Sequence, residues 1–477
     1  MKGAKHSQYW FTRFVFQRAL GIIYFIGFLI ILTQYRALLG VNGVLPVRFF
    51  LSQVRIWDVP SLLWISSSDG FALTLAVLGA VGALGAAVGA SELFGIWVSS
   101  VVWGLLWLLY LSFVNVGQVF YGYGWESLLL ETGFLAIFLG SARTEPPRLI
   151  IWLYRWVLFR VMFGAGLIKL RGDSCWWDLS CMQYHYETQP LPNPMSWYFH
   201  QLPPLVHKAS VVFTHFVEVV VPFAFFGPRL ARHIAGCVTI VFQLVLIVSG
   251  NLSWLNYLTL VLCVACFDDS FFALVIKMPR HAARAIEGRR RAMLSVLGLF
   301  IVVLSVRPAL NLLSSGQLMN STFDALHLVN TYGAFGNISR RRLEIIFEGT
   351  SDDVPDKNTR WQVYEFECKP GDPRRRPCII SPFHLRLDWQ LWFAAMSPPQ
   401  LHPWIFSFVA KLLQGDRAVL DLLSFNPFPG APPAFVRASL YEYHFTKRGS
   451  DGGAWWTRQL VREYFRPLQL RDLAAGG

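Results

Sequence analysis

The sequence predicts a polytopic α-helical membrane protein that ends in a C-terminal domain of mixed α/β structure. Of its 477 residues, 54% are hydrophobic and only 15% are charged, whereas an ordinary soluble domain has about 25% charged residues. Apolar runs of membrane-spanning length recur as far as residue 310, and strand-like alternation and turn clusters replace them beyond it. The basic loops between these runs also fall on one side of the predicted membrane.

A spanning helix needs about 20 apolar residues, and about nine segments approach that length. They are residues 19–35, 71–90, 93–113, 126–140, 149–168, 209–226, 234–250, 256–276 and 293–310. We expect the first segment to remain in the protein, because no small-residue cleavage site of the signal-peptide kind follows it. The segment 126–140 is short and also suits a re-entrant segment, so the predicted number of spans is approximate.

The distribution of Lys and Arg predicts the orientation of these spans. With a cytoplasmic N-terminus, the basic loops 141–148, 227–233 and 277–292 all lie on the cytoplasmic side. This topology accounts for the net charge of +13, so we do not expect a nucleic-acid partner. Membrane lipid is the partner that the composition implies.

The opposite side of the membrane then receives the larger pieces of the chain, where we expect function to lie. We divide the chain into a membrane domain, 1–310, with the large loops 36–70 and 169–208, and a C-terminal domain, 311–477. Both loops and the C-terminal domain lie on this side, which is the lumenal side in a eukaryotic cell.

Within the C-terminal domain, short apolar runs and period-two alternation predict strands. Residues 325–331 and 343–347 are strand-like, and 361–367 alternates between polar and apolar side chains. Residues 389–395 and 403–413 have the pattern of helices. A domain of this size and mixture can fold around a core of its own.

Ionisable residues inside a membrane are costly and usually face a partner or a cavity. Five lie in or at the ends of the expected spans: Glu126, Glu131, Arg155, Arg160 and Glu218. The simpler interpretation is ion pairing between helices, for example of Glu131 with Arg160. The alternative is a polar cavity that opens toward loop 169–208, with Lys169 and His185 at its mouth. In such a cavity, burial would favour the neutral amine of Lys169 and let it act as a base. Without such a cavity, the Lys169 side chain extends from the end of its helix toward water.

Several polar residues of the loop and the C-terminal domain suggest covalent features. In an oxidising lumen Cys368 and Cys378 can form a disulfide, and so can Cys175 and Cys181, although reduced thiols remain an alternative for both pairs. The sequons at Asn320 and Asn337 are the candidate glycosylation sites. His185 with Glu187 lacks a second spaced ligand, so we expect no metal site and no cofactor.

Several long sequence blocks together identify a family. They are Gly124-Trp-Glu-Ser-Leu-Leu-Leu-Glu-Thr-Gly-Phe134, Gly164-Ala-Gly-Leu-Ile-Lys-Leu-Arg-Gly-Asp173, His185-Tyr-Glu-Thr-Gln-Pro-Leu-Pro-Asn-Pro194, His327-Leu-Val-Asn-Thr-Tyr-Gly-Ala-Phe-Gly336 and Arg386-Leu-Asp-Trp-Gln-Leu-Trp-Phe-Ala-Ala395. Over nearly its whole length the chain resembles the lipase maturation factor family, in particular the first of its two vertebrate paralogues. The long polar N-terminal extension of the vertebrate members is not seen in this sequence.

This resemblance implies a protein of the endoplasmic-reticulum membrane that is chaperone-like and not an enzyme. Its partners would be secreted dimeric lipases, such as lipoprotein lipase, which would need it to fold, to assemble and to leave the compartment in active form. Its C-terminal domain would be lumenal. If the source is bacterial, the implied location is the cytoplasmic (inner) membrane.

A second and much shorter likeness covers Phe163-Gly-Ala-Gly-Leu-Ile-Lys-Leu170 only. This segment is similar to a lysine-bearing helix end in the membrane domain of vitamin K-dependent carboxylases, where the lysine that matches Lys169 serves as a base. It implies an alternative function, a membrane enzyme that uses Lys169 as a base on a lipid-like or quinone-like substrate.

Overall fold

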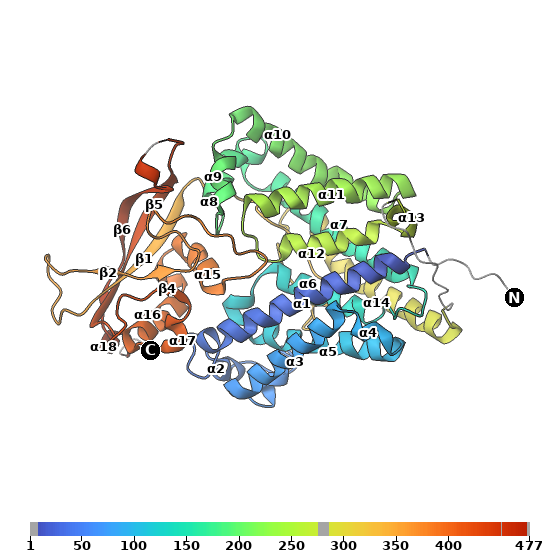
Figure 1. The fold of residues 1–477 in the computed structure, drawn as a ribbon, viewed down its shortest axis with the longest axis horizontal. Coiled ribbons are helices and arrows are strands. Elements are labelled where there is room, and N and C mark those ends of the chain that lie inside the picture. The colour runs from blue at the N-terminus through green and yellow to red at the C-terminus, as the bar shows by residue number, and fades with distance from the viewer. Residues whose placement is uncertain (1–7, 275–285, 450, 475–477) are drawn as a thin grey trace.

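A bundle of long helices forms most of the protein, and a sheet with its own helices covers one end of that bundle (Figure 1). The computed structural model describes residues 8–274, 286–449 and 451–474. The bundle comes from the apolar part of the sequence, and the sheet comes from the C-terminal part. This arrangement confirms the predicted fold class.

Seven helices in the described part of the chain are long and apolar enough to cross a membrane. They are α1 (Trp10–Leu38), α3 (Asp69–Ala87), α5 (Ile96–Val116), α7 (Arg148–Arg171), the helix Pro204–Phe226, α11 (Arg229–Ser249) and α14 (Gly288–Leu313). The helix Pro204–Phe226 changes its winding twice, from α10 (Pro204–His215) through a π-helical turn, η4 (Phe216–Val220), to the 3₁₀ segment η5 (Val221–Phe226). Each of the seven overlaps one of the expected spans.

The other two expected spans, 126–140 and 256–276, form shorter helices. They are α6 (Gly124–Ala136) and α12 (Leu255–Cys263), which η6 (Val264–Cys266) extends. Nearly every residue of α6 is buried, because the longer helices and the C-terminal region surround it. Residues 275–276 of the second expected span lie outside the described residues.

Hydrogen bonds tie the N-terminal end of α1 to other loops at the same end of the bundle. Arg13 donates to the carbonyl of Thr144 at 2.6 Å, and Gln17 donates to that of Gly140 at 3.0 Å. Arg290, at the start of α14, donates to the carbonyl of Phe138 at 3.1 Å. The basic loops 141–148 and 277–292 therefore meet at one end of the bundle, although residues 277–285 lie outside the described part.

Shorter helices connect these long ones. They are α2 (Val47–Leu51), η1 (Leu62–Trp64), α4 (Ala90–Leu93), η2 (Gln118–Tyr121), η3 (Ser174–Trp176), α8 (Cys181–Thr188), α9 (Pro194–His200) and α13 (Asp269–Phe272). Pro194 at the first position of α9 is preorganised for a helix, and Asn193 caps it by accepting from the Ser196 N–H at 2.9 Å.

The C-terminal region is built on a four-stranded antiparallel sheet in the order β2-β1-β5-β6. Its strands are β1 (Arg342–Thr350), β2 (Gln362–Val363), β5 (Phe435–Phe445) and β6 (Trp456–Leu468), and a small second sheet pairs β3 (Glu365–Phe366) with β4 (Leu423–Phe425). The helices are α15 (Arg386–Ala395), η7 (Pro399–Leu401), α16 (Trp404–Gln414), α17 (Arg417–Leu420), η8 (Asp451–Gly453) and α18 (Leu470–Ala474). Phe347 of β1 packs edge-on against Phe408 of α16, so α16 covers one face of the larger sheet.

The prediction of a strand at 325–331 is wrong, since only one isolated bridge, Thr322 to Asn330, forms there. Side-chain carboxylates accept backbone N–H groups that would otherwise pair with a neighbouring strand. The N–H of Asn330 donates to Glu131 of α6 at 3.1 Å, and that of Leu328 donates to Asp324 at 3.2 Å. The expected strands at 343–347 and 361–367 fall in β1 and in β2 and β3, and the expected helices fall in α15 and α16.

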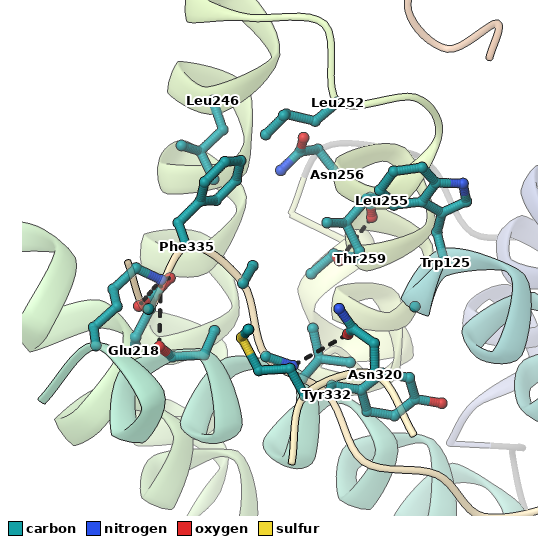
Figure 2. A pocket seen from close by; sticks show the side chains of 18 of the residues that line it. Trp125, Glu218, Leu246, Leu252, Leu255, Asn256, Thr259, Asn320, Tyr332 and Phe335 are labelled. Carbon is teal, nitrogen blue, oxygen red and sulfur yellow. Dashed lines mark hydrogen bonds and ion pairs between the residues drawn. The ribbon is translucent and has the colours of Figure 1, made fainter. Parts of the chain in front are cut away.

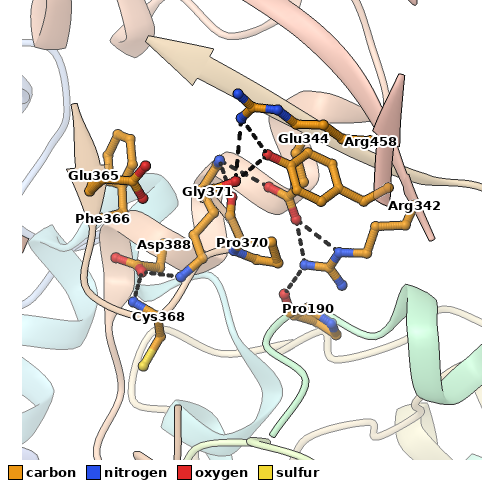
Figure 3. Close-up of polar contacts among 12 residues, drawn as sticks. Pro190, Arg342, Glu344, Glu365, Phe366, Cys368, Pro370, Gly371, Asp388 and Arg458 are labelled. Carbon is orange, nitrogen blue, oxygen red and sulfur yellow. Dashed lines mark hydrogen bonds and ion pairs between the residues drawn. The ribbon is translucent and has the colours of Figure 1, made fainter. Parts of the chain in front are cut away.

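Loop 169–208 is joined to the C-terminal region by a buried polar network (Figure 3). Arg342 of β1 donates to the carbonyl of Pro190 at 2.8 Å and forms an ion pair with Glu344, to which Lys369 also binds at 3.0 Å. Asp388 of α15 accepts the backbone N–H groups of Cys368 and Lys369, each at 2.8 Å. The loop therefore has a defined structure that depends on the sheet.

Candidate functional site

A cavity of about 330 Å³ lies where the ends of α7, α11 and α12 meet α15 and the segment 319–337. Most of its lining is apolar. Figure 2 shows Glu218 on one wall, with Leu252, Leu255 and Trp125 toward the opposite side. Lys169, His185 and Glu218 all line it, so the structure gathers three residues that were singled out in the sequence. Ligand pockets in proteins have volumes of this order, about 300–1,000 Å³.

Lys169 and Glu218 form a buried ion pair on the cavity wall. The Nζ of Lys169 lies 2.7 Å from Oε2 and 2.9 Å from Oε1 of Glu218, and both side chains are almost fully buried. Glu218 belongs to the π-helical turn η4, which passes close to α7. A Cβ on Gly166 would lie 3.0 Å from the Cβ of Glu218 and still closer to Val219. Gly166 therefore permits the approach that brings the two charges together.

The surroundings of Lys169 bear on its chemistry. Its Nζ also donates to the carbonyl of Ala165 at 3.3 Å, so three acceptor oxygens surround the amino group. The structure therefore shows Lys169 as a hydrogen-bonding partner of Glu218.

His185 lies on the same cavity and is 5% exposed. Its ring packs edge-on against Phe335 at 5.0 Å between centroids. Burial and the nearby charge of Lys169 lower the pKa of His185 to about 4, so the ring is neutral at physiological pH. Within the described residues, no group forms a hydrogen bond with either of its ring nitrogens.

Glu131 of α6 and Arg160 of α7, which the sequence analysis paired, are in contact inside the bundle. Arg160 donates to both carboxylate oxygens of Glu131 and, at 2.5 Å, to the carbonyl of Asn330. Tyr332 donates to Glu131 at 2.6 Å, and the side chain of Asn330 donates to it at 3.1 Å. These bonds fasten the segment before the sheet to the centre of the bundle.

Glu126 and Arg155 find different partners. Glu126 binds Arg386 of α15 at 2.8 Å and accepts from the hydroxyl of Tyr110 at 2.6 Å. Arg155 donates to the carbonyl of Ala265 at 2.8 Å and to the hydroxyl of Tyr9 at 3.1 Å. Both residues therefore hold helices together and lie apart from the cavity.

The four cysteines of the polar segments are joined as Cys175–Cys181 and Cys368–Cys378. Both disulfides lie at the sheet end of the bundle, beside η3 and α15 respectively. The remaining cysteines, all in apolar helices, have free thiols: Cys237, Cys263 and Cys266. Among the described residues there is no group of three or more His, Cys, Asp or Glu side chains that could hold a metal ion.

The two candidate glycosylation residues lie at the cavity. Asn320 and Asn337 are both exposed overall and both line it. The side-chain oxygen of Asn320 accepts from the N–H of Gly333 at 3.3 Å. Whether either residue carries a glycan stays a prediction.

Sequence reasoning missed the part that α15 plays in this site. Trp389, Trp392 and Phe393 of α15 form one side of the cavity, and Arg386 enters the bundle. A signal was present, because an arginine, an aspartate and two tryptophans in one short helix do not suit an ordinary surface helix. The pattern could not show that this helix packs against the ends of the bundle.

The fold and the site together define the class of protein. It is a polytopic helical membrane protein whose C-terminal region closes a cavity at one end of the bundle. Two family models match the chain, the lipase maturation factor transmembrane domain over residues 11–274 and the lipase maturation factor C-terminal domain over residues 328–466. The chain belongs to the lipase maturation factor family.

Individual relatives agree with this assignment. The chain is 44% identical to human lipase maturation factor 1 and 42% identical to the mouse protein, over 98% of this chain and 89% and 88% of those proteins. It is 32% identical to lipase maturation factor 2 of Xenopus laevis, over 97% of this chain and 83% of that protein. No solved structure matches the chain.

Proposed function

We propose that this protein is a chaperone-like maturation factor that secreted dimeric lipases, such as lipoprotein lipase, require to fold, to assemble and to be exported. Membership of the family supports a role in lipase maturation in general. In this proposal the protein lies in the endoplasmic-reticulum membrane, with its C-terminal domain, 311–477, in the lumen.

The distribution of cysteines supports this orientation. Disulfides persist in oxidising compartments and are rare where glutathione keeps thiols reduced. Both disulfides lie at the end of the bundle that carries the sheet, and the free thiols lie in apolar helices. The basic loops lie at the other end, as the positive-inside rule requires of the cytoplasmic side.

We propose the uncovered edge of β6 as the surface that binds the client lipase. β6 lies at the end of the sheet order, and residues 457–463 are exposed on both faces. Leu460 is 55% exposed and Val461 is 38% exposed. An edge strand presents unpaired N–H and C=O groups that can pair with an extended segment of another chain. A partly folded lipase monomer exposes such segments together with apolar surface.

Loop 169–208 supports this surface from one side. Trp197 of α9 donates to the carbonyl of Thr446 at 2.9 Å, and its ring packs against Trp455. Thr446 and Trp455 belong to the connection between β5 and β6. In the proposed mechanism, this connection and the edge of β6 hold the monomer and cover its dimer-interface surface until a second monomer binds.

The test is rescue of lipoprotein lipase in cells that lack their own maturation factor. We expect this chain to raise the activity per secreted lipase molecule and the dimeric fraction of the lipase. The double variant Leu460→Asp with Val461→Asp should lose most of this rescue at normal abundance. Val354→Asp is the matched control, because Val354 is also an exposed apolar residue, 82% exposed, but lies away from β6.

Each arm can contradict a separate part of the proposal. No rescue by the wild-type chain, with the protein expressed and inserted, would contradict the maturation role. Full rescue by the β6 double variant would contradict the proposed client surface and leave the general role intact.

A further inference from the structure

The cavity beneath α15 has the properties of a ligand site that the role in lipase maturation does not explain. It is partly open, and its lining combines aliphatic and aromatic side chains with a few polar groups. The argument for its ligand rests on its charge, the ring nitrogens of His185, its size and its mouth.

The cavity wall has no net charge to offer a ligand. The ammonium of Lys169 already has the carboxylate of Glu218 at 2.7 Å. His185 is neutral at physiological pH, because burial and the charge of Lys169 lower its pKa to about 4. Gln243 and Asn256, on a neighbouring wall, bind each other at 2.7 Å. An ion that entered would lose its hydration without gaining a counter-charge, so the cavity favours a neutral molecule.

His185 supplies a hydrogen-bonding group whose partner is missing. The residue is 5% exposed and lines the cavity, and none of the described residues forms a hydrogen bond with its ring nitrogens. A neutral imidazole can either donate or accept, so a ligand hydroxyl or carbonyl oxygen would satisfy it.

The apolar lining and the volume indicate the kind and the length of the ligand's hydrocarbon part. Leu246 of α11 with Leu252 and Leu255 gives an aliphatic wall that suits hydrocarbon. A cavity of about 330 Å³ lies at the lower end of the range for ligand pockets, about 300–1,000 Å³. This size suits a ligand with a single acyl chain of medium length.

The mouth lies at the end of the bundle that carries the sheet. Of the lining residues, Met319 is 42% exposed and Phe393 is 39% exposed, and Asn320 and Asn337 are exposed too. The lining residues deeper in the bundle, such as Met162 and Phe242, are buried. A ligand therefore enters between α15 and the segment 319–337, past two amide side chains that suit a polar head.

From these observations we propose that the cavity binds a neutral single-chain lipid, such as a monoacylglycerol, with its chain along Leu246 and an oxygen of its head on His185. This site does not depend on the proposed client surface. It is a binding site without a chemical step.

The experiment uses the purified full-length protein in detergent and a photoreactive 1-decanoylglycerol that carries a diazirine in its chain. We expect labelling of peptides that line the cavity, with competition by unlabelled 1-decanoylglycerol at concentrations at least tenfold below those needed for decanoate or decyltrimethylammonium. Leu246→Trp fills the cavity and should reduce labelling at least tenfold. Leu244→Trp is the matched control, because Leu244 lies on the same helix and is 47% exposed on its outer face.

His185→Phe keeps the ring and removes its nitrogens, so it tests the hydrogen bond if the tryptophan variant does not fold. We expect its affinity for 1-decanoylglycerol to fall about 5- to 30-fold, the range that loss of one buried hydrogen bond gives. Equal labelling of the Leu246→Trp and Leu244→Trp variants would overturn the proposal. So would equal competition by decanoate, or unchanged affinity in His185→Phe.

Discussion

Arg386, the first residue of α15, binds Glu126 of α6 through a contact of 2.8 Å between its guanidinium and the carboxylate. Both side chains are fully buried. The guanidinium also donates to the carbonyl of Phe120 at 2.6 Å and lies 3.5 Å from the ring centre of Tyr121. This pair attaches the C-terminal region to the helix bundle by joining the start of α15 to the start of α6.

Breaking this pair on one side should be costly. Arg386→Met and Glu126→Gln each leave a buried polar or charged partner unmatched, which costs about 3–5 kcal/mol of unfolding free energy. The double variant should recover much of that loss, because no charge is left unpaired. Thermal unfolding of the detergent-purified protein measures this. The control is Asp58→Asn, which breaks the exposed pair of Asp58 with Arg55 and should change stability little. Additive losses in the double variant would contradict the coupling.

Lys169 can be tested as a structural partner and as a base in one experiment. Lys169→Met leaves Glu218 buried without a counter-charge, so we expect protein abundance and lipase rescue to fall together. Adding Glu218→Met removes the unpaired charge and should restore both. If the double variant is abundant but gives no rescue, Lys169 has a chemical role and the enzyme alternative gains support. Abundance by immunoblot and lipase activity per molecule are the two readouts.

Gly164 of α7 touches the chain that leads into the sheet. A Cβ at this position would lie 2.3 Å from the carbonyl oxygen of Tyr332. Relieving this clash requires a shift of the backbone, which costs more free energy than a shift of a flexible side chain. We expect Gly164→Ala to lower the unfolding free energy by about 1–3 kcal/mol. Gly85→Ala on α3 is the control, because a Cβ there meets open space, and it should be neutral or stabilising by about 0.4–1 kcal/mol. Equal effects of the two variants on thermal unfolding would contradict this packing.

His327 predicts a loss of stability on acidification. Its ring nitrogens lie 3.0 Å from the hydroxyl of Ser127 and 3.0 Å from the amide oxygen of Asn115. Burial lowers its pKa to about 4, although the charge of Asp324 acts to raise it. Because the unfolded pKa is about 6.5, the unfolded state binds the proton first, and stability falls as the pH drops from about 6.5 toward 4.

Replacement of this histidine isolates its share of the pH effect. At pH 5 that share is about 2 kcal/mol. His327→Gln cannot titrate, so its stability should fall less than that of the wild type between pH 7 and pH 5, as followed by thermal unfolding. An equal fall in His327→Gln and the wild type would contradict the assignment.

The sequence by itself determined the class of fold, the places of the seven long helices, the family and two of the strand segments, those at 343–347 and 361–367, because these depend on local hydrophobic pattern and on continuous blocks. It also showed that charged residues inside the bundle need partners. Only the tertiary structure decided which partners they have: Lys169 meets Glu218 through the close approach at Gly166, and Glu126 meets Arg386 from a distant helix. The cavity likewise depends on α15 packing against α7, α11 and α12, and contacts between segments so far apart leave no periodic signal in a single sequence.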